Sequence, residues 1–299
     1  MQRFCQSFMT ELCKYIGPDI DRPTMGMGVG EREIGYLYGQ YKRMNNRAWS
    51  SGVPFLWGCQ SGSFFQAPGY GVVHFANEMI KDQNDTLEGK RCLILGSGKV
   101  ARSVAEKILA YGGIPLSFSD PSGHVYEPEG IDEGKLLTIS NILSERGANV
   151  GRYIISSTTA QFNEPASIFD IPCDLCFPCG AMFDIDEDAV NKLLDGGCQG
   201  IIEGGQQAVS LGARKILRKR GAMYAPHTAS LTGCSIVNGL GIQTGGKEAD
   251  ELLQKEITRI YEEVKATARE FNTRGDLHAG ATISGFIRVA NHMNKHGAV

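Results

Sequence analysis

Apolar residues near both ends of the chain recur at helical spacing. Phe4, Phe8 and Leu12 stand four residues apart, which places them on one face of a helix, before a Gly-Pro pair interrupts the pattern. Beyond residue 247, the stretches ELLQKEITRIYEEVKATAREF and ATISGFIRVANHMNK show the same kind of spacing. We therefore expect an amphipathic helix over residues 2–16 and two more helices after residue 247.

Between these helices, short apolar runs alternate with helical patterns. KRCLILG and IPLSFSD are bounded by charge or glycine and predict buried strands, with helical spacing over residues 99–111 between them. The later runs RYIISST, CDLCFP, QGIIEG and GAMYAP predict further short strands, and helices are expected over residues 70–81, 187–194 and 209–220. Strands that alternate with helices are typical of βαβ units, so the sequence predicts an α/β fold with a parallel sheet.

Composition bounds the class of protein without naming a partner. The chain has 299 residues, 42% of them hydrophobic, which suffices for one large domain or two smaller ones, and its formal charge of −3 gives no overall attraction to nucleic acid. Nine cysteines at irregular spacings follow an opening, MQRFCQSFMT, that matches no signal or transit peptide. We expect reduced thiols and an intracellular location, with cytoplasm and mitochondrial matrix both open. Because no apolar run reaches the roughly 18 residues of a membrane span, we expect no membrane contact.

A glycine-rich turn joins the first predicted strand to the helix after it. In Gly96-x-Gly98-x-x-Ala101, the first glycine permits a tight turn, the second lets the backbone approach a pyrophosphate, and the alanine allows close helix packing. Asp120 stands 22 residues after Gly98, at the end of the next strand, where a carboxylate can bind an adenosine ribose. The sequence therefore predicts a dinucleotide site with these candidate residues: Gly96, Ser97, Gly98, Lys99, Val100 and Asp120.

Two of these candidates have an alternative role. Asp120 lies within SDPSG and also fits an N-cap or turn aspartate, which would be the preferred interpretation without the glycine loop. Lys99 can pair with a phosphate, or it can be a solvated lysine in the first turn of its helix, and the sequence favours neither.

Two further clusters have a functional interpretation that the sequence does not favour. Cys173, Cys176 and Cys179 form C-x-x-C-x-x-C, but structural zinc needs four ligands and no paired fourth lies nearby, so we expect core thiols and no metal. A basic stripe on one predicted helix can contact RNA phosphates, although a solvated face is the favoured interpretation. The stripe consists of Arg214, Lys215, Arg218, Lys219 and Arg220. The scattered histidines are assigned no role.

Several motifs, in their order along the chain, resemble hexameric glutamate dehydrogenase of the Glu/Leu/Phe/Val dehydrogenase family. They are RFCQSFMTEL, GVGEREIGYLYGQYKR, GYGVVHFANEM, LEGKRCLILGSGKVARSVAEKILAYGG, DIPCDLCFPC and AGATISGFIRVANHM, and the match runs from Gln2 to Val299. The resemblance implies a doubly wound Rossmann-type domain, expected over residues 57–246, and a remnant, mainly helical substrate domain over residues 1–56 plus 247–299. It also implies hydride transfer from glutamate to a nicotinamide cofactor, NAD or NADP.

The chain departs from the family where the resemblance implies catalytic and substrate-binding residues. The motif P-x-x-D-x-G-V-G-x-R-E is PTMGMGVGERE here, so Gly26 replaces an aspartate that relays protons, and glycine has no titratable group. Four further family motifs also differ in this chain. R-P-E-A-T-G-Y-G of the family corresponds to FFQAPGYG here, P-C-A-T-Q-N to PCGAMF, E-G-A-N to EGGQ, and K-A-A-N-A-G-G-V-A-T-S-G-L to TASLTGCSIVNGL. The lysine-bearing substrate segment of the family would precede residue 1, so the chain is expected to be truncated at its N-terminus. We assign no catalytic residue and expect NAD or NADP to bind weakly or not at all.

Two functions remain open at this point. The first is a glutamate-dehydrogenase-like pseudoenzyme that acts as a structural or regulatory subunit and can still hold a nucleotide; the alternative is an active amino-acid dehydrogenase of altered specificity. In the family, the helix matching residues 2–16 covers strands that come earlier in the sequence, so we expect another protein chain to cover its apolar stripe in a larger assembly. The competing expectation is that the C-terminal helix around Phe286 and Val289 covers this stripe.

Overall fold

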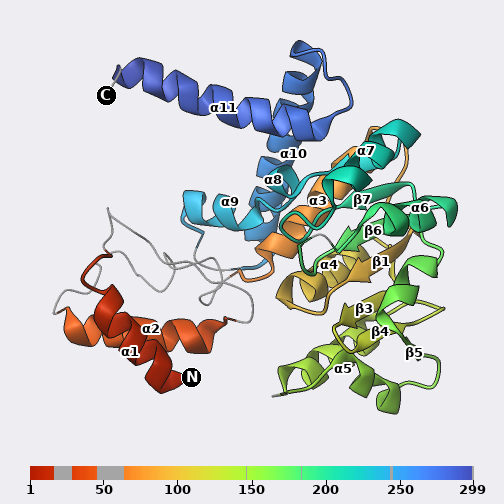
Figure 1. Cartoon of the computed structure of the whole chain (residues 1–299), viewed down its shortest axis with the longest axis horizontal. Helices are drawn as coiled ribbons and strands as arrows, with labels where there is room; N and C mark the ends of the chain where they lie inside the picture. The colour runs from red at the N-terminus through yellow and green to blue at the C-terminus, as the bar shows by residue number, and fades with distance from the viewer. Residues whose placement is uncertain (17–28, 46–63, 146, 183, 243–244, 298–299) are drawn as a thin grey trace. The chain divides into compact units, whose positions relative to one another are not determined.

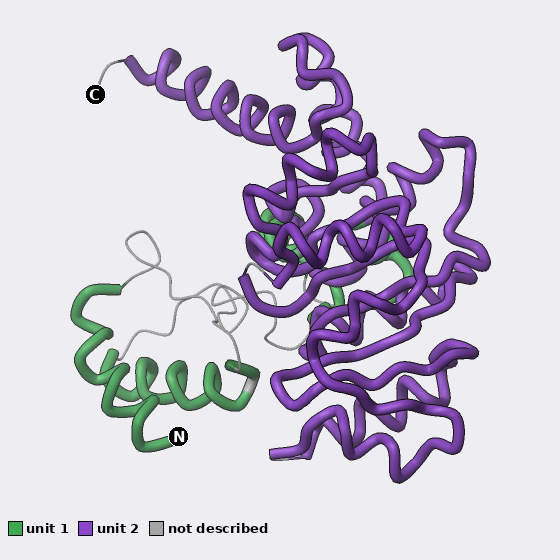
Figure 2. Tube along the Cα trace, turned by 45° about the vertical axis from the view of Figure 1, so that its right-hand side comes forward, with its two compact units in different colours: residues 1–67, 234–253 green, residues 68–233, 254–299 purple. Residues whose placement is uncertain are grey.

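The structure is a computed structural model that describes residues 1–16, 29–45, 64–145, 147–182, 184–242 and 245–297 (Figure 1). Contacts divide the chain into two compact units, Met1–Ala67 with Cys234–Leu253 and Pro68–Gly233 with Gln254–Val299 (Figure 2). This division places most of the C-terminal helices in the same unit as the sheet. The functional domains expected from the sequence, 1–56 plus 247–299 and 57–246, stay a prediction.

The first unit contains a packed pair of helices, α1 (Gln2–Leu12) and α2 (Glu31–Met44). Met9 and Ile16 pack with Ile34 and Tyr41 in a small buried cluster. The helix predicted over residues 2–16 is confirmed, but it ends at residue 12 and is followed by a turn. α9 (Gly233–Leu240) and the first residues of α10 (Lys247–Glu270) also fall largely in this unit.

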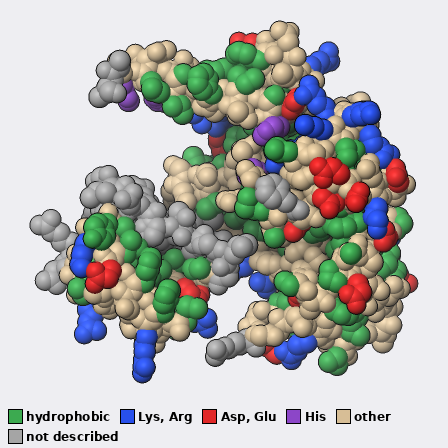
Figure 3. Space-filling model, in the orientation of Figure 1, with side chains coloured by type: hydrophobic (Ala, Val, Ile, Leu, Met, Phe, Trp, Pro, Cys, Tyr) green, Lys and Arg blue, Asp and Glu red, His purple; other side chains and the backbone are tan. Residues whose placement is uncertain are grey.

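In the predicted apolar stripe of α1, only Leu12 packs against the cluster shared with α2, while Phe4 and Phe8 lie off that face. Phe4 and Phe8 are 68% and 50% exposed and stack on each other with ring centroids 6.2 Å apart. Figure 3 shows hydrophobic side chains on the surface of the α1–α2 pair. On α11 (Leu277–His296), Phe286 and Val289 are likewise exposed, at 71% and 59%. Each of these helices therefore leaves apolar side chains in contact with solvent.

The second unit is built on a parallel sheet whose described strands follow the order β2-β1-β6-β7-β8. The strands are β1 (Arg91–Leu95), β2 (Ile114–Pro115), β6 (Leu175–Pro178), β7 (Gly200–Ile202) and β8 (Met223–Ala225). A small antiparallel sheet, β3-β4-β5, consists of β3 (Ser117–Asp120), β4 (Gly123–Tyr126) and β5 (Gln161–Asn163). The α/β fold with a parallel sheet predicted from the alternating pattern is confirmed.

Helices precede, connect and follow these strands, and several begin at a side-chain cap. They are α3 (Ala67–Lys81), α4 (Lys99–Ala110), α5 (Glu133–Ser144), α6 (Glu187–Asp195), α7 (Leu211–Arg220) and α8 (His227–Ser230), with the long helices α10 and α11. Asp132, Asp186, Ser210 and Asp276 each accept a hydrogen bond from a backbone N–H in the first turn of the helix that follows. No helix within the described ranges has the length and apolar character needed to cross a bilayer.

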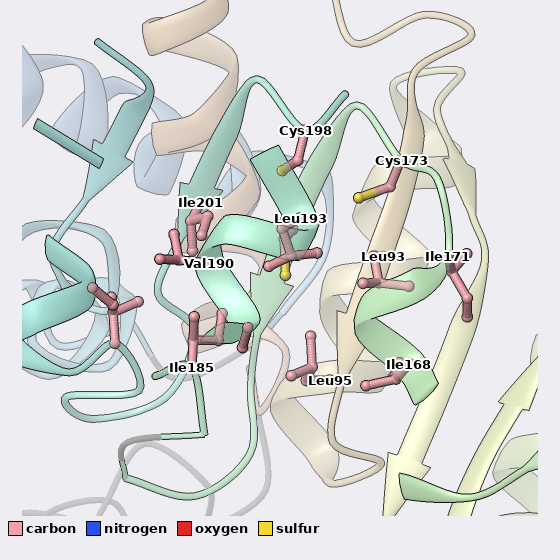
Figure 4. Close-up of a cluster of buried hydrophobic side chains, with 14 of the residues drawn as sticks. Leu93, Leu95, Ile168, Ile171, Cys173, Ile185, Val190, Leu193, Cys198 and Ile201 are labelled. Carbon is pink, nitrogen blue, oxygen red and sulfur yellow. The ribbon is translucent and has the colours of Figure 1, made fainter. Parts of the chain in front are cut away.

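The core of the sheet domain contains alternate residues of β1 and the inward faces of α6 and α7. Leu93 and Leu95 pack with Val190, Leu193 and Leu217 in one buried cluster (Figure 4). This arrangement follows from the two-residue period of a strand and the 3.6-residue period of a helix, which turn alternate strand residues and one face of each helix to the same layer.

One predicted strand is wrong. RYIISST forms part of a 3₁₀ helix, η2 (Val150–Ser156), and a second one, η3 (Pro165–Asp170), follows β5. Val150 and Tyr153 are the buried residues of η2, and their spacing of three is the period of a 3₁₀ helix. The Tyr153 hydroxyl donates to the buried carboxylate of Glu127, so tertiary contacts override the β-propensity of this stretch.

Candidate functional site

The glycine loop leaves the carboxyl end of β1 and leads directly into α4. Gly96 has φ +95°, and a Cβ at this position would lie 2.9 Å from the carbonyl oxygen of Cys179, so only glycine fits. Gly98 is the N-cap of α4 with φ −68°, and a Cβ there would meet nothing within 4 Å. The first N–H groups of a helix lack intrahelical acceptors and attract anions. The loop therefore presents an open, donor-rich surface at Gly98, which fits a pyrophosphate.

Serine hydroxyls connect this loop to β3. Ser117 Oγ accepts from the Ile94 N–H at 3.1 Å and donates to the Ile94 carbonyl at 2.9 Å, and Ser119 Oγ accepts from the Gly96 N–H at 2.7 Å. These side chains bridge β1 and β3 where the backbone ladder of β2 has ended. The Gly96 N–H is consequently occupied within the protein, so a phosphate at this loop has to use the N–H groups from Ser97 onwards. These serines are not among the predicted site residues, although both lie in the predicted strand.

Asp120 lies at the end of β3, as expected, and its carboxylate is already hydrogen-bonded. Oδ1 accepts from the Ser122 N–H at 2.8 Å and from the Ser122 hydroxyl, and Oδ2 accepts from the Val150 N–H at 2.7 Å. The turn role that the sequence left open is therefore present in the structure. A carboxylate has about four acceptor positions, so these bonds leave one for a ribose hydroxyl, and that role stays a prediction.

Lys99 and Val100 lie in the first turn of α4 and are both half-buried. Lys99 forms no ion pair with any residue that the structure describes, so its two interpretations stay open. The Val100 carbonyl lies 2.7 Å from the position that a Cβ on Gly69 would take. This close approach brings α3 against the helix that begins at the loop.

The loop after β6 packs directly against the glycine loop, and the loop after β7 packs against the loop after β6. A Cβ on Gly205 would lie 2.8 Å from the carbonyl oxygen of Gly180, and a Cβ on Gly204 would lie 2.5 Å from Cys179 Sγ. A carboxyl oxygen of Asp184 occupies the space that a Cβ on Gly180 would need, and burial raises the pKa of this carboxyl. Asp184 is thus a titratable group beside the loop that the sequence analysis missed; its one sequence signal is its place just after a predicted strand.

A second buried carboxylate, Glu203, follows β7 directly. Its oxygens accept from the Val209 N–H at 2.9 Å and from the His227 N–H at 2.7 Å, and Arg214 Nη2 lies 3.5 Å away. His227 Nδ1 lies 3.0 Å from Glu203 Oε2 and 3.3 Å from the Gln207 nitrogen. His227, which the sequence analysis left without a role, is therefore attached to the loops at the carboxyl edge of the sheet.

The basic stripe of α7 is largely engaged within the chain. Arg214 pairs with Glu203, Arg218 with Asp276 at 3.1 Å, and Arg220 with Asp195 at 2.8 Å. These pairs reduce the positive charge that α7 offers to an external phosphate. Contact with RNA stays an untested and unfavoured prediction.

The predicted core thiols are present in the sheet domain. Cys173 and Cys176 are buried, Cys179 is half-buried, and all three carry free thiols. The expectation of reduced thiols does not extend to Cys234, which is disulfide-bonded. Among the residues described, no cluster of histidine, cysteine, aspartate or glutamate has a geometry that would hold a metal ion.

Comparison with known proteins identifies relatives along the whole chain. Residues 63–297 match the family model described as Glutamate/Leucine/Phenylalanine/Valine dehydrogenase, and residues 1–43 match the model of the Glu/Leu/Phe/Val dehydrogenase dimerisation domain. The chain is 34% identical to an NADP-specific glutamate dehydrogenase of Giardia intestinalis, covering 100% of this chain and 69% of the relative. It is 36% identical to an NADP-specific glutamate dehydrogenase of Chlorella sorokiniana, covering 100% of this chain and 59% of that protein.

Solved structures give the same result. The fold is similar to that of a glutamate dehydrogenase of Plasmodium falciparum, with a TM-score of 0.89, 32% identity, and coverage of 100% of this chain and 66% of the other. The chain thus spans roughly 59% to 69% of the length of these relatives.

Proposed function

Because this chain belongs to the Glu/Leu/Phe/Val dehydrogenase family, we propose that it binds NAD or NADP at the glycine loop and acts as a dehydrogenase of glutamate or a related amino acid. The observation that carries the proposal is the open surface at Gly98, where the loop after β1 meets the first turn of α4. The relatives support the activity, since they include NADP-specific glutamate dehydrogenases and an NAD(P)-specific one.

The residues of this chain have separable roles in the proposal. The N–H groups of Gly98, Lys99 and Val100 would hold the pyrophosphate, and Asp120 would accept from a ribose hydroxyl with its remaining lone pair. When bound, the nicotinamide ring supplies the acceptor for hydride. Asp184 lies next to Gly180 with a raised pKa, so it is the carboxyl group beside the loop that is best placed to hold a proton.

A second candidate function is a non-catalytic member of the family that serves as a structural or regulatory subunit. Specific substitutions favour it: Gly26 stands where the family resemblance implies a proton-relaying aspartate, although it lies outside the described residues, and the buried Pro68 replaces a threonine. Such losses remove preorganised polar groups, on which oriented hydride transfer depends. The exposed Phe4 and Phe8 support the accompanying proposal of a protein partner. An intracellular location likewise stays a proposal.

Two measurements on the purified chain separate these functions. Absorbance at the nicotinamide band reports turnover with glutamate, and with other amino acids, in the presence of NAD or NADP; calorimetry reports binding of NAD, NADP and ADP-ribose. Turnover that Gly98→Ala abolishes supports the dehydrogenase. Binding without turnover, lost in Gly98→Ala, supports the non-catalytic member. If none of the three ligands produces heat with the wild-type chain, nucleotide binding and the dehydrogenase are wrong, and only a structural subunit without a nucleotide remains.

A further inference from the structure

Two cysteines lie next to each other at the amino ends of neighbouring strands. β6 and β7 are parallel and pair Leu175 with Gly200 and Cys176 with Ile201. The ladder continues one step before the strands, where the Gln199 N–H donates to the Asp174 carbonyl at 2.8 Å. At the same register, the next pair outward is Cys173 and Cys198. Neighbouring strands lie roughly 4.8 Å apart, within the Cα separation of about 4.4 to 6.8 Å that a disulfide spans.

The side chains of this pair lie in the same buried cluster. Figure 4 shows the Cys173 side chain pointing toward the segment that carries Cys198, and both side chains belong to one buried cluster. Both residues are mostly buried, with exposures of 6% and 5%. The Cys198 thiol in turn donates to the Gly200 carbonyl at 3.3 Å. The strand register and the shared cluster thus place the two side chains next to each other on one face of the sheet.

We propose that Cys173 and Cys198 form a dithiol site that a small hydroperoxide oxidises to a disulfide within the chain. The Cys198 sulfur attacks one peroxide oxygen, the O–O bond breaks, and the leaving oxygen departs as water or an alcohol after taking the thiol proton. The Cys173 sulfur then attacks the resulting sulfenic acid at sulfur, and hydroxide leaves with the Cys173 proton as water. Two thiols are oxidised and one hydroperoxide is reduced.

The surroundings explain why Cys198 reacts first. The neighbouring Cys173 thiol lowers the pKa of Cys198, and Cys198 in turn raises the pKa of Cys173. The neighbouring thiols of Cys92 and Cys176 are fully buried, and burial raises the pKa of both. Because the thiolate is the nucleophile, these two thiols remain inert while Cys198 reacts.

The site is separate from the proposed nucleotide loop. Cys173 and Cys198 precede their strands, whereas the glycine loop and the loops that pack on it follow the strands at the opposite edge of the sheet. The dithiol site therefore does not depend on the proposed function of the glycine loop, and it can be tested in the chain without any nucleotide.

Peptide mapping tests the proposal directly. The folded chain is treated with hydrogen peroxide, its remaining thiols are alkylated in denaturant, and it is cut with trypsin and with a protease that cleaves before aspartate. Cys173 is then the only cysteine of peptide 170–173, and Cys198 the only one of peptide 195–214. We expect these peptides to be joined, to be lighter than their sum by two hydrogens, and to separate on reduction.

Variants make the outcome specific. Cys198→Ser and Cys173→Ser should each lose the joined peptide, while Cys92→Ala, which removes a thiol from the same sheet, should retain it. The proposal is overturned if the wild-type chain yields both peptides unjoined after oxidation. It is also overturned if Cys198 is recovered as a sulfinic acid without a link to Cys173.

Discussion

The two glycines of the loop should respond in opposite ways to the same substitution. Gly96 has φ +95°, and its ideal Cβ lies 2.9 and 3.0 Å from the carbonyl oxygen and carbon of Cys179, which are backbone atoms that cannot turn away. Gly98 has φ −68° and open space around its Cβ position. Gly96→Ala therefore strains the folded chain, whereas Gly98→Ala places a methyl group only where a ligand would lie.

The magnitudes follow from these geometries. An alanine at a positive φ costs on the order of 1–3 kcal/mol, and overlap with a fixed neighbour adds about 1–3 kcal/mol. We therefore expect Gly96→Ala to lower the free energy of unfolding by about 3 kcal/mol. Gly98→Ala replaces a tolerated N-cap residue by a poor one and should cost about 0.5–1 kcal/mol. Its methyl group should weaken nucleotide binding by tenfold or more, or about 1.4 kcal/mol.

Urea unfolding and calorimetry on the same preparations check both expectations. The contrast matters more than either value: Gly96→Ala should be far less stable than Gly98→Ala, and Gly98→Ala should fold normally while losing affinity for NAD and NADP. Equal stability of the two variants would refute the assignment of Gly96 as the sterically constrained turn residue. Unchanged affinity in a folded Gly98→Ala variant would show that the pyrophosphate does not approach this glycine.

Two more predictions concern buried titratable groups. Glu203→Gln removes the charge that faces Arg214 in a buried site and should lower the free energy of unfolding by about 3 kcal/mol, measured by urea unfolding. Glu187→Gln, at an exposed position, should change it by less than about 0.5 kcal/mol. Similar losses in both variants would contradict a special role of Glu203. Burial lowers the pKa of His124 from its ordinary value of 6.5, so the folded state keeps this ring neutral and the unfolded state takes up the proton first. The contribution of the neutral His124 ring to stability is present above pH 6.5 and is lost as the pH falls. His124→Asn should therefore flatten the decline in melting temperature from about pH 7 to about pH 5. An unchanged decline would exclude His124 as its cause.

Local sequence patterns predicted much of the sheet domain. The runs around Leu93, Phe177 and Ile201 became parallel strands, and Gly96 took the strained turn that its place after a strand indicated. These features depend on periodicity and on the unique backbone freedom of glycine, so they can be recognised from neighbouring residues alone. The same reasoning failed for Val150 and Tyr153, whose conformation follows from contacts with residues far away in the sequence.

The sequence by itself determined the α/β fold, the glycine loop and the family to which the chain belongs. Only the tertiary structure decided which groups meet at the carboxyl edge of the sheet: that Ser119 occupies the Gly96 N–H, that Asp184 lies against Gly180, and that Glu203 joins Arg214 to His227. It also decided that Cys173 lies beside Cys198 and that Phe4 and Phe8 stay exposed. The physical reason is that a local pattern fixes the direction of a side chain relative to its own strand or helix, whereas its partner is supplied by another segment, whose position depends on strand order, register and packing.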